Sequence, residues 1–592
     1  MEKKPVHNYY TILATKWQST ALDEQLALGF KKVATTIRYN TASTDYDSAN
    51  TPMTLLFPVL RPQIINLILA FTSPIAEPYH IITTLDVYHF KWYTAIFDRL
   101  NMLAAKDMML WFCFHIPYFD TSRFNHPDKS TILQETYIKL LDYASTKWLK
   151  SNYFTEDEFL YISNETCFPY AASYHWDNNR VLLSKYCTLI RIICGSWINY
   201  TANHLVSYPK KHNSKPSICF ISDCLVADSS VFRDRAALIG KLDKSRYDVF
   251  VASFIPKDKI NHKIASRFIS KLGENYIYLG SNISTARRLL EPYAFDIIVY
   301  PDIGMKVRPT MLAYSRLAPT QINTWGHSET SGIDTIDYFI SSKYFETDIS
   351  TASKFYSEKL VLMESLSTYY VSPSMLFLDN QLDARDVIRS RLGFQPSDRI
   401  YGCLQTFYKI SPVMIKIIAG ILSRDCNAVV ILSNCFPYPK CLAAQLIASG
   451  GEMWNGEFKR RIRWFPPLDK KKYLELVNIC DLHLDTHPFG GCNTSYDAFD
   501  FNIPVITMPT NKISGRFTFG LYKKMDTDTG VDIVKDCVVR STEEYITRAI
   551  EIANNGKLRA MISRKIESGK KAIFMEDNCI KEYENFFKKL YK

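Results

Sequence analysis

The sequence lacks the patterns that mark several common protein classes. Its 14 cysteines form no C-x-x-C pair and have no regular spacing, so we expect neither a zinc site nor a disulfide framework. The most apolar early stretch, residues 62–71, is interrupted by Gln63 and Asn66 and is too short to span a bilayer. The first residues contain no apolar signal-peptide core. Scattered thiols without such a leader predict a cytoplasmic protein with no membrane span.

The net charge of the chain does not identify a class of binding partner. The chain carries 71 Lys and Arg against 60 Asp and Glu, a net charge of +11, but the basic residues are scattered and form no tail. This distribution does not predict a nucleic-acid partner, and it is compatible with an anionic substrate. With 592 residues, 47% of them hydrophobic, the chain is long enough for about three domains with large buried cores.

The first part of the chain has helical periodicity. Apolar residues recur at three- and four-residue spacing in residues 21–34, 89–105, 131–149 and 182–198. This pattern predicts an all-α domain over residues 1–205, without a recognisable tetratricopeptide repeat. Such a domain either packs on the rest of the chain or selects protein partners.

From residue 217 onward, apolar strands alternate with helix-length segments. One series of strands is predicted at 217–222, 247–253, 275–279 and 295–300, and a second at 400–405, 428–433, 461–465, 482–485 and 505–508. Alternation of this kind predicts parallel sheets built from βαβ units. We therefore expect an α/β protein with one Rossmann-like lobe over 206–395 and another over 396–592, the second ending in helices over 542–591. Its ligand would lie in a cleft at the carboxyl ends of the strands.

Residues 481–509, DLHLDTHPFGGCNTSYDAFDFNIPVITMP, are the most informative part of the sequence. An apolar strand ends at Asp485, a Pro/Gly turn follows, and polar residues 493–495 precede a short helix predicted over residues 496–501. The free N–H groups and the dipole at such a helix start attract an anion, so the stretch predicts a phosphate site. Asp497, one turn into the helix, is placed to accept a ribose hydroxyl. The alternative is an ordinary βα turn without a ligand.

Two further segments bring polar residues to the expected cleft. Gln405 and Lys409 directly follow a predicted strand, and a lysine there can neutralise a leaving diphosphate. Most lysines, however, are solvated surface groups. The loop within residues 317–341 combines small hydroxyl residues with Trp325 and His327, which suits a sugar pocket, although a lone histidine is more often structural.

Several blocks, in this order, resemble the O-linked N-acetylglucosamine transferase family, the SPINDLY-like family 41 glycosyltransferases. They are LAPTQ, WGHSETSG and IDY within 317–338, FYSEKLVL at 355–362, the Gln-Lys-Pro block at 405–412, and LD followed by GGCNTSYDA within 484–498. The resemblance covers about residues 217–560. It implies a GT-B fold, two Rossmann-like lobes facing a cleft, and inverting transfer of N-acetylglucosamine from a UDP-sugar to Ser or Thr of proteins.

The resemblance also implies roles for individual residues. Gln405 and Lys409 would hold the diphosphate, Asp497 the ribose, and no essential metal would be needed. The remaining residues expected at the donor site are Gly491, Cys492, Asn493, Thr494, His327 and Arg516.

One feature of the family is missing. Its members carry histidines after the first strand of the first lobe, whereas here Asp223 matches but the histidine position holds Ala227 or Asp228. The proton acceptor is therefore left open among Asp223, Asp228, His175 and the donor's own phosphate. Two alternatives follow: a UDP-glucose-dependent transferase acting on Asn or a glycan, or a pseudoenzyme or scaffold that binds UDP-sugar. The protein acceptor would be selected by the helical N-terminal domain.

Overall fold

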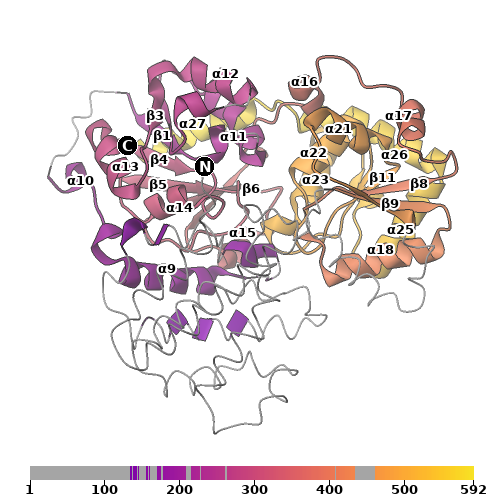
Figure 1. Cartoon of the computed structure of the whole chain (residues 1–592), viewed down its shortest axis with the longest axis horizontal. Helices are drawn as coiled ribbons and strands as arrows, with labels where there is room; N and C mark the ends of the chain where they lie inside the picture. Colours follow the sequence, from indigo (N-terminus) through magenta and orange to yellow (C-terminus); the bar gives the residue numbers. More distant parts are fainter. Residues whose placement is uncertain are drawn as a thin grey trace, which may run out of the picture.

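The computed structural model describes residues 170–207, 215–406, 409–433 and 460–591, except 175, 177, 227, 228, 261 and 262, together with short helical pieces between 134 and 160. The helices predicted at 21–34 and 89–105 lie outside these residues. The described end of the predicted N-terminal domain is helical, with η4 (Tyr170–Tyr174), α9 (Arg180–Cys194) and α10 (Asn203–Ser207). Figure 1 shows α9 lying against the first lobe.

The first lobe is built on a seven-stranded parallel sheet with the order β3-β2-β1-β4-β5-β6-β7. The chain fills one side from β1 and then the other from β4, so the topological switch point lies between these two strands. The strands are β1 (Ser217–Ile221), β2 (Asp248–Ser253), β3 (Tyr276–Tyr278), β4 (Ile297–Tyr300), β5 (Thr320–Thr324), β6 (Tyr338–Ser342) and β7 (Lys359–Met363). The main helices of this lobe are α11 (Ser230–Lys241), α12 (Lys263–Leu272), α13 (Ile283–Leu290) and α14 (Val307–Ala313).

The second lobe has a five-stranded parallel sheet with the order β10-β9-β8-β11-β12. Its strands are β8 (Arg399–Cys403), β9 (Ala428–Ser433), β10 (Ile462–Phe465), β11 (Leu482–Leu484) and β12 (Val505–Ile506). Its main helices are α18 (Pro412–Arg424), α21 (Lys470–Ile479), α22 (Asn493–Asp500), α23 (Phe517–Thr529), α25 (Thr542–Asn554) and α26 (Gly556–Gly569). The two parallel sheets confirm the predicted pair of Rossmann-like lobes, which lie side by side in Figure 1.

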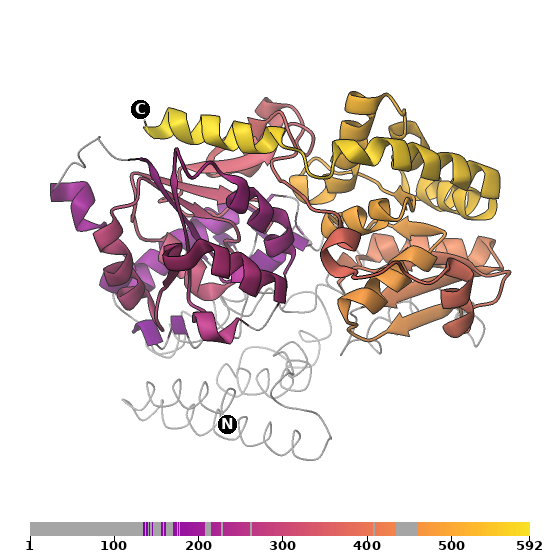
Figure 2. The same cartoon turned by 90° about the horizontal axis from the view of Figure 1, so that it is seen from above.

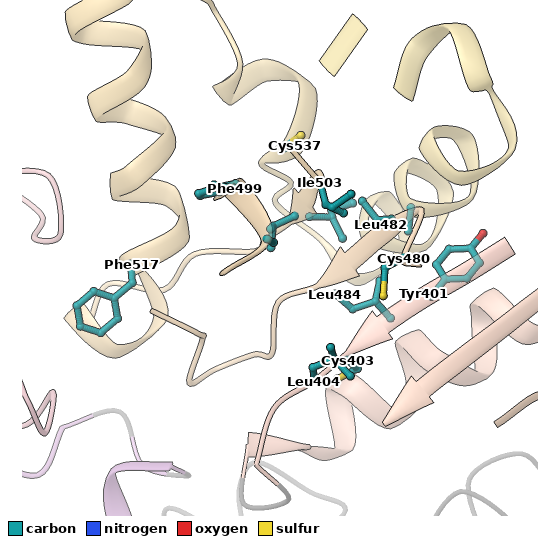
Figure 3. Packing of buried hydrophobic residues seen from close by; sticks show 14 of the residues in the cluster. Tyr401, Cys403, Leu404, Cys480, Leu482, Leu484, Phe499, Ile503, Phe517 and Cys537 are labelled. Carbon is teal, nitrogen blue, oxygen red and sulfur yellow. The ribbon is translucent and has the colours of Figure 1, made fainter. Parts of the chain in front are cut away.

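Continuous apolar runs explain why these strands are central. All five residues of β1 are buried, and so are all three residues of β11, as expected of parallel strands covered by helices on both faces. Figure 3 shows the core of the second lobe, where Leu482 and Leu484 of β11 lie close to Tyr401 and Cys403 of the neighbouring strand. Several helices of the two lobes begin at side-chain caps, among them Ser229, Ser411 and Ser541.

The last helix, α27 (Asn578–Tyr591), returns to the first lobe (Figure 2). Tyr583 and Phe587 are buried in the core of that lobe. The Tyr247 hydroxyl donates a hydrogen bond of 2.7 Å to the carbonyl oxygen of Glu584, whose carboxylate pairs with Arg246. By sequence this helix follows the second lobe, but by packing it joins the first, so the chain connects the lobes twice.

Candidate functional site

The predicted site residues gather where two neighbouring strands of the second lobe end. β8 and β11 are adjacent and parallel, so their carboxyl ends lie at the same edge of the sheet. Gln405 and Lys409 follow β8, and Asp485 follows β11. We call residues 485–492, which connect β11 to α22, the glycine loop.

Hydrogen bonds and close packing hold the glycine loop in one conformation. The Asp485 carboxylate accepts the Gly491 N–H at 2.6 Å and the Thr507 hydroxyl at 2.7 Å, while burial raises the pKa of this carboxyl. A Cβ atom at Gly491 would lie 2.1 Å from Thr494 Oγ1 and 2.3 Å from Gln405 Nε2. Any other residue at this position would therefore force the Thr494 and Gln405 side chains to shift.

Lys409 brings a positive charge to the same loop. Its Nζ donates to the Gly490 carbonyl at 2.7 Å and to Gln405 Oε1 at 3.3 Å, and it lies 4.7 Å from the centre of the Phe489 ring. Burial lowers the pKa of Lys409 to about 8, against the opposing charge of Asp485. The side chain is still mainly cationic at neutral pH. Because its charge is poorly solvated, it would attract a nearby anion more strongly than an exposed lysine would.

The start of α22 supplies further donors beside Lys409. The backbone N–H groups of Cys492, Asn493 and Thr494 have no hydrogen-bond partner within the described part of the chain, as expected at a helix N-terminus. Gln405 Nε2 donates to Thr494 Oγ1 at 2.5 Å, which fixes the helix start next to the lysine. A helix N-terminus and a buried lysine together make a site for a phosphate group.

The side chains of Asn493 and Asp497 are held by the first lobe. Asp497 forms a buried ion pair with Arg233 of α11. Asn493 Nδ2 donates to Asp234 at 3.2 Å, and Asn493 Oδ1 accepts the Tyr370 hydroxyl at 2.6 Å. Burial raises the pKa of Asp234 to about 6. The predicted ribose residue thus lies at the contact between the lobes, with a cation of the other lobe beside it.

The Nε2 atom of His327 finds its hydrogen-bond partners in the N-terminal segment. It lies 3.2 Å from the Tyr170 carbonyl oxygen and 3.3 Å from Ser173 Oγ. Burial lowers the pKa of His327 to about 4, and the nearby charge of Lys512 adds to this effect. The imidazole is therefore neutral at physiological pH and is placed by the structure as a packed polar residue near the lysines.

Three parts of the chain meet beside His327. We call residues 325–332 of the first lobe the tryptophan loop. Its Glu329 forms a buried ion pair with Lys512 of the second lobe and accepts a hydrogen bond of 2.7 Å from Asn179 of the N-terminal segment. The Tyr174 ring of that segment lies 4.6 Å from the Phe489 ring of the glycine loop. The end of the N-terminal region is therefore part of the site's wall.

Arg516 lies near the site, but its side chain binds backbone carbonyl oxygens of both lobes. Its guanidinium donates to three backbone carbonyl oxygens, those of Phe345 at 3.1 Å, Thr510 at 3.0 Å and Glu346 at 3.3 Å. Two of these carbonyls belong to the first lobe, so the side chain joins the lobes behind the glycine loop. Its predicted role in donor binding stays a prediction.

Among the candidates for the proton acceptor, the structure describes Asp223. It follows β1 and accepts the Ser253 hydroxyl at 2.7 Å and the Phe254 N–H at 2.8 Å, and burial raises its pKa. Asp228 and His175 lie outside the described residues.

A second carboxylate, which the sequence reasoning missed, lies across the topological switch point. Asp302 follows β4 and its side chain is completely buried, with Ser222 and Cys224 close enough to its carboxylate to favour the charged form. Burial raises the pKa of Asp302 to about 6, and the charge of Asp223 contributes. Carboxylates at a switch point are candidates for function because ligands of such sheets bind there.

Other residues at the site were also missed. They are brought in from distant parts of the chain, and no local motif marks them. The one available signal was the charged triplet at 233–235, which lies on α11, since charges on a helix that covers a sheet require partners. The missed residues are Arg233, Asp234, Glu329, Lys470 and Lys512.

Metal and membrane features were also sought within the described residues. That part of the chain contains no group of three or more His, Cys, Asp or Glu side chains placed to hold a metal ion. Nor does it contain a helix with the length and apolar character needed to cross a membrane. The expectation that donor binding needs no metal stays a prediction.

Three curated relatives can be compared with the chain. The Arabidopsis thaliana protein SEC, a probable UDP-N-acetylglucosamine–peptide N-acetylglucosaminyltransferase, is 27% identical over 246 residues, 41% of this chain and 24% of its own length. The similarly described SPINDLY of Solanum lycopersicum is 23% identical over 392 residues, 64% of this chain and 36% of its own. The UDP-glucose:protein N-beta-glucosyltransferase of Actinobacillus pleuropneumoniae serotype 5b is 22% identical over 373 residues, which are 62% of this chain and 55% of its own length. The chain thus spans between a quarter and just over half of the length of these relatives. No family model matches the chain.

A solved structure shows the fold. A lysine-to-methionine mutant of the Thermobaculum terrenum O-GlcNAc transferase superposes with a TM-score of 0.55 at 16% identity, over 89% of this chain and 97% of that one. Together with the two parallel sheets, this match confirms the predicted GT-B fold. The resemblance seen in the sequence blocks is confirmed as well: the chain is a distant relative of the O-linked N-acetylglucosamine transferases and SPINDLY proteins.

Proposed function

We propose that the protein is an inverting glycosyltransferase that transfers a sugar from a UDP-sugar to a protein acceptor. The supporting observation is the position of Lys409, whose Nζ lies 2.7 Å from the glycine-loop carbonyl of Gly490, beside the free N–H groups that start α22. N-acetylglucosamine is the proposed sugar, in line with the names of the plant relatives, which are described as UDP-N-acetylglucosamine–peptide transferases. Ser or Thr is the proposed acceptor residue.

In this mechanism the acceptor hydroxyl attacks C1 of the sugar while the bond from C1 to the diphosphate oxygen breaks. Negative charge accumulates on the departing UDP. Lys409 and the N-terminus of α22 stabilise that charge, because they are fixed before the reaction and poorly solvated. Positive charge from these groups takes the part that Mg²⁺ plays in other transferases, so no metal is proposed.

The proton of the acceptor hydroxyl needs a destination. Asp223 and Asp302 flank the switch point of the first lobe, and a carboxylate with a raised pKa is a better base than an ordinary one. Asp228 and His175 remain further candidates. A weak base suffices, because the hydroxyl loses its proton late in the reaction.

A second donor and acceptor pair has its own support. The match to the Actinobacillus enzyme, named a UDP-glucose:protein N-beta-glucosyltransferase, covers nearly as much of this chain as the SPINDLY match does, 62% against 64%. The same site is therefore also proposed, as an alternative, to transfer glucose to an Asn side chain. The N-terminal region, whose Tyr174 packs on Phe489, is proposed to select the protein acceptor in the cytoplasm.

The direct test measures UDP release from a panel of UDP-sugars by the wild-type protein and by Lys409→Ala, with UDP binding measured by calorimetry. Lys416→Ala is the matched control, since Lys416 is an exposed lysine on α18. Turnover of one sugar that Lys409→Ala abolishes and Lys416→Ala preserves would support the proposal and name the donor. UDP binding without turnover from any sugar would favour a pseudoenzyme, and absence of UDP binding would refute the site.

A further inference from the structure

Two helices from different lobes meet at the predicted ribose position. Arg233 lies on α11 of the first lobe and Asp497 on α22 of the second, 264 residues apart in sequence. Their ion pair is almost completely enclosed, with 5% and 1% of the two side chains exposed. Both guanidinium Nη atoms reach the carboxylate, Nη1 at 3.3 Å from Oδ2 and Nη2 in contact with Oδ1. The contact is therefore bidentate and buried, unlike an ordinary surface ion pair.

Aromatic rings hold the arginine in place. The guanidinium carbon lies 5.2 Å from the centre of the Tyr370 ring and 5.6 Å from that of Phe377. The Nε atom is buried and has no hydrogen-bond partner within the described residues. A planar guanidinium kept between rings loses little further freedom when it pairs with a carboxylate, so it fixes the plane of that carboxylate.

The carboxylate keeps capacity for a ligand. An ionised carboxylate offers about four lone-pair positions; the guanidinium takes two of them and the Tyr473 hydroxyl a third, which leaves one for a ligand. Lys470 Nζ lies 3.9 Å from Asp497 Oδ2, and 25% of the lysine side chain is exposed. Lys470 is thus a partly exposed neighbour of the enclosed carboxylate.

We infer that Arg233 is a positioning residue of the donor site, contributed by the opposite lobe, which acts through Asp497 on the ribose hydroxyls of a nucleoside diphosphate sugar. The inference rests on the proposed function. Without the guanidinium, the buried Asp497 would lose both its countercharge and its fixed orientation, and hydroxyl groups could no longer be bound at a defined position. Because Arg233 belongs to the first lobe, the ribose is then held well only while the lobes are in contact.

A chemical double-mutant cycle isolates this effect. Calorimetry compares UDP with 2′,3′-dideoxy-UDP on the wild-type chain, Arg233→Met and Asp497→Asn. We expect Arg233→Met to weaken UDP binding by about tenfold, the lower range for loss of a supporting partner, and to change dideoxy-UDP binding by less than about twofold. Asp497→Asn should show the same selectivity. Arg424→Met, which removes an exposed arginine paired with Glu543, should affect neither ligand.

Other results would overturn the inference. Equal weakening of both ligands by Arg233→Met would mean a merely structural role, and tighter UDP binding would mean that Arg233 competes with the nucleotide. Should Arg233→Met fold poorly, Arg233→Lys serves in its place, since it keeps the charge but cannot form the bidentate contact; it should lose part of the selectivity for the ribose hydroxyls, and full retention would overturn the inference. Absence of UDP binding to the wild-type chain would refute the proposed function itself, which separates that failure from failure of this inference.

Discussion

The glycine loop and the tryptophan loop lie at the carboxyl edges of their respective sheets but are stabilised in different ways. The glycine loop is fixed mainly from within its own lobe, by Asp485 accepting the Gly491 N–H and by Gln405 donating to Thr494. The tryptophan loop is held within its own lobe by Glu358, which accepts the Ser331 N–H at 2.7 Å, but it is also held from outside. Its Glu329 pairs with Lys512 of the second lobe and accepts a hydrogen bond from Asn179 of the N-terminal segment.

The difference indicates what each loop does. A loop that presents backbone N–H groups and a lysine suits a ligand common to many reactions, such as a diphosphate. A loop whose buried glutamate is paired with side chains from the second lobe and the N-terminal segment depends on how those parts are assembled, and it suits the groups that differ between reactions. We therefore expect substitutions at the glycine loop to weaken donor binding or turnover, and substitutions at the tryptophan loop to lower the stability of the fold.

The largest expected effect concerns stability. Lys512→Met leaves Glu329 buried without its countercharge, which costs about 3–5 kcal/mol when a buried pair is broken, so the free energy of unfolding measured in urea should fall by that amount. Arg424→Met removes one partner of an exposed pair with Glu543 and should change it far less. The double variant Lys512→Met, Glu329→Leu should recover much of the loss. Equal effects of Lys512→Met and Arg424→Met would contradict the comparison.

Lys409 should show the opposite behaviour, a large loss of activity with little loss of stability. Lys409→Ala should lower turnover of the UDP-sugar roughly 10²–10³-fold, as loss of a group that stabilises transition-state charge does. The stability of Lys409→Ala should be close to that of the wild type. Burial lowers the pKa of Lys409, so the charged lysine is disfavoured in the folded state, and its removal should cost little. A thermal melt beside the UDP-release assay measures both. A Lys409→Ala protein that is fully active would refute the role of the glycine loop.

Gly491→Ala tests the packing of the glycine loop directly. The added methyl would lie 2.1 Å from Thr494 Oγ1 and 2.3 Å from Gln405 Nε2, so the start of α22 must move. Overpacking of this kind should raise the Kd for UDP by about tenfold. Gly556→Ala is the matched control, since no atom lies within 4 Å of a Cβ there. Unchanged UDP binding by Gly491→Ala would show that the loop adapts.

The smallest expected effect is a pH dependence. The lowered pKa of Lys409, about 8, means that its positive charge is present below pH 8 and lost above it. The kcat/KM for the UDP-sugar, which reports ionisation of the free enzyme, should therefore fall roughly tenfold between pH 7 and pH 9. Lys409→Arg, if active, should flatten this limb because arginine stays charged. If kcat/KM fell to the same extent between pH 7 and pH 9 in Lys409→Arg, the fall would have to be assigned to a group other than Lys409.

Much of the fold could be predicted because parallel sheets leave strong local patterns. β9 has the predicted bounds at Ala428–Ser433, since a buried central strand is a continuous apolar run between turns. β7 at Lys359–Met363 was not predicted as a strand: it pairs only with β6 and its residues are buried unevenly. α22 starts at Asn493, earlier than the predicted residue 496, because the polar residues 493–495 belong to its first turn.

The sequence by itself determined the two alternating series of strands and helices, and the glycine loop with its phosphate-binding character, because these depend on residues close together in the chain. Only the tertiary structure decided that Arg233 meets Asp497, that Lys512 meets Glu329, and that the last helix returns to the first lobe. These contacts join residues hundreds of positions apart. A buried charge requires a partner, but which residue supplies it depends on how the lobes pack, and no local pattern in the chain contains that information.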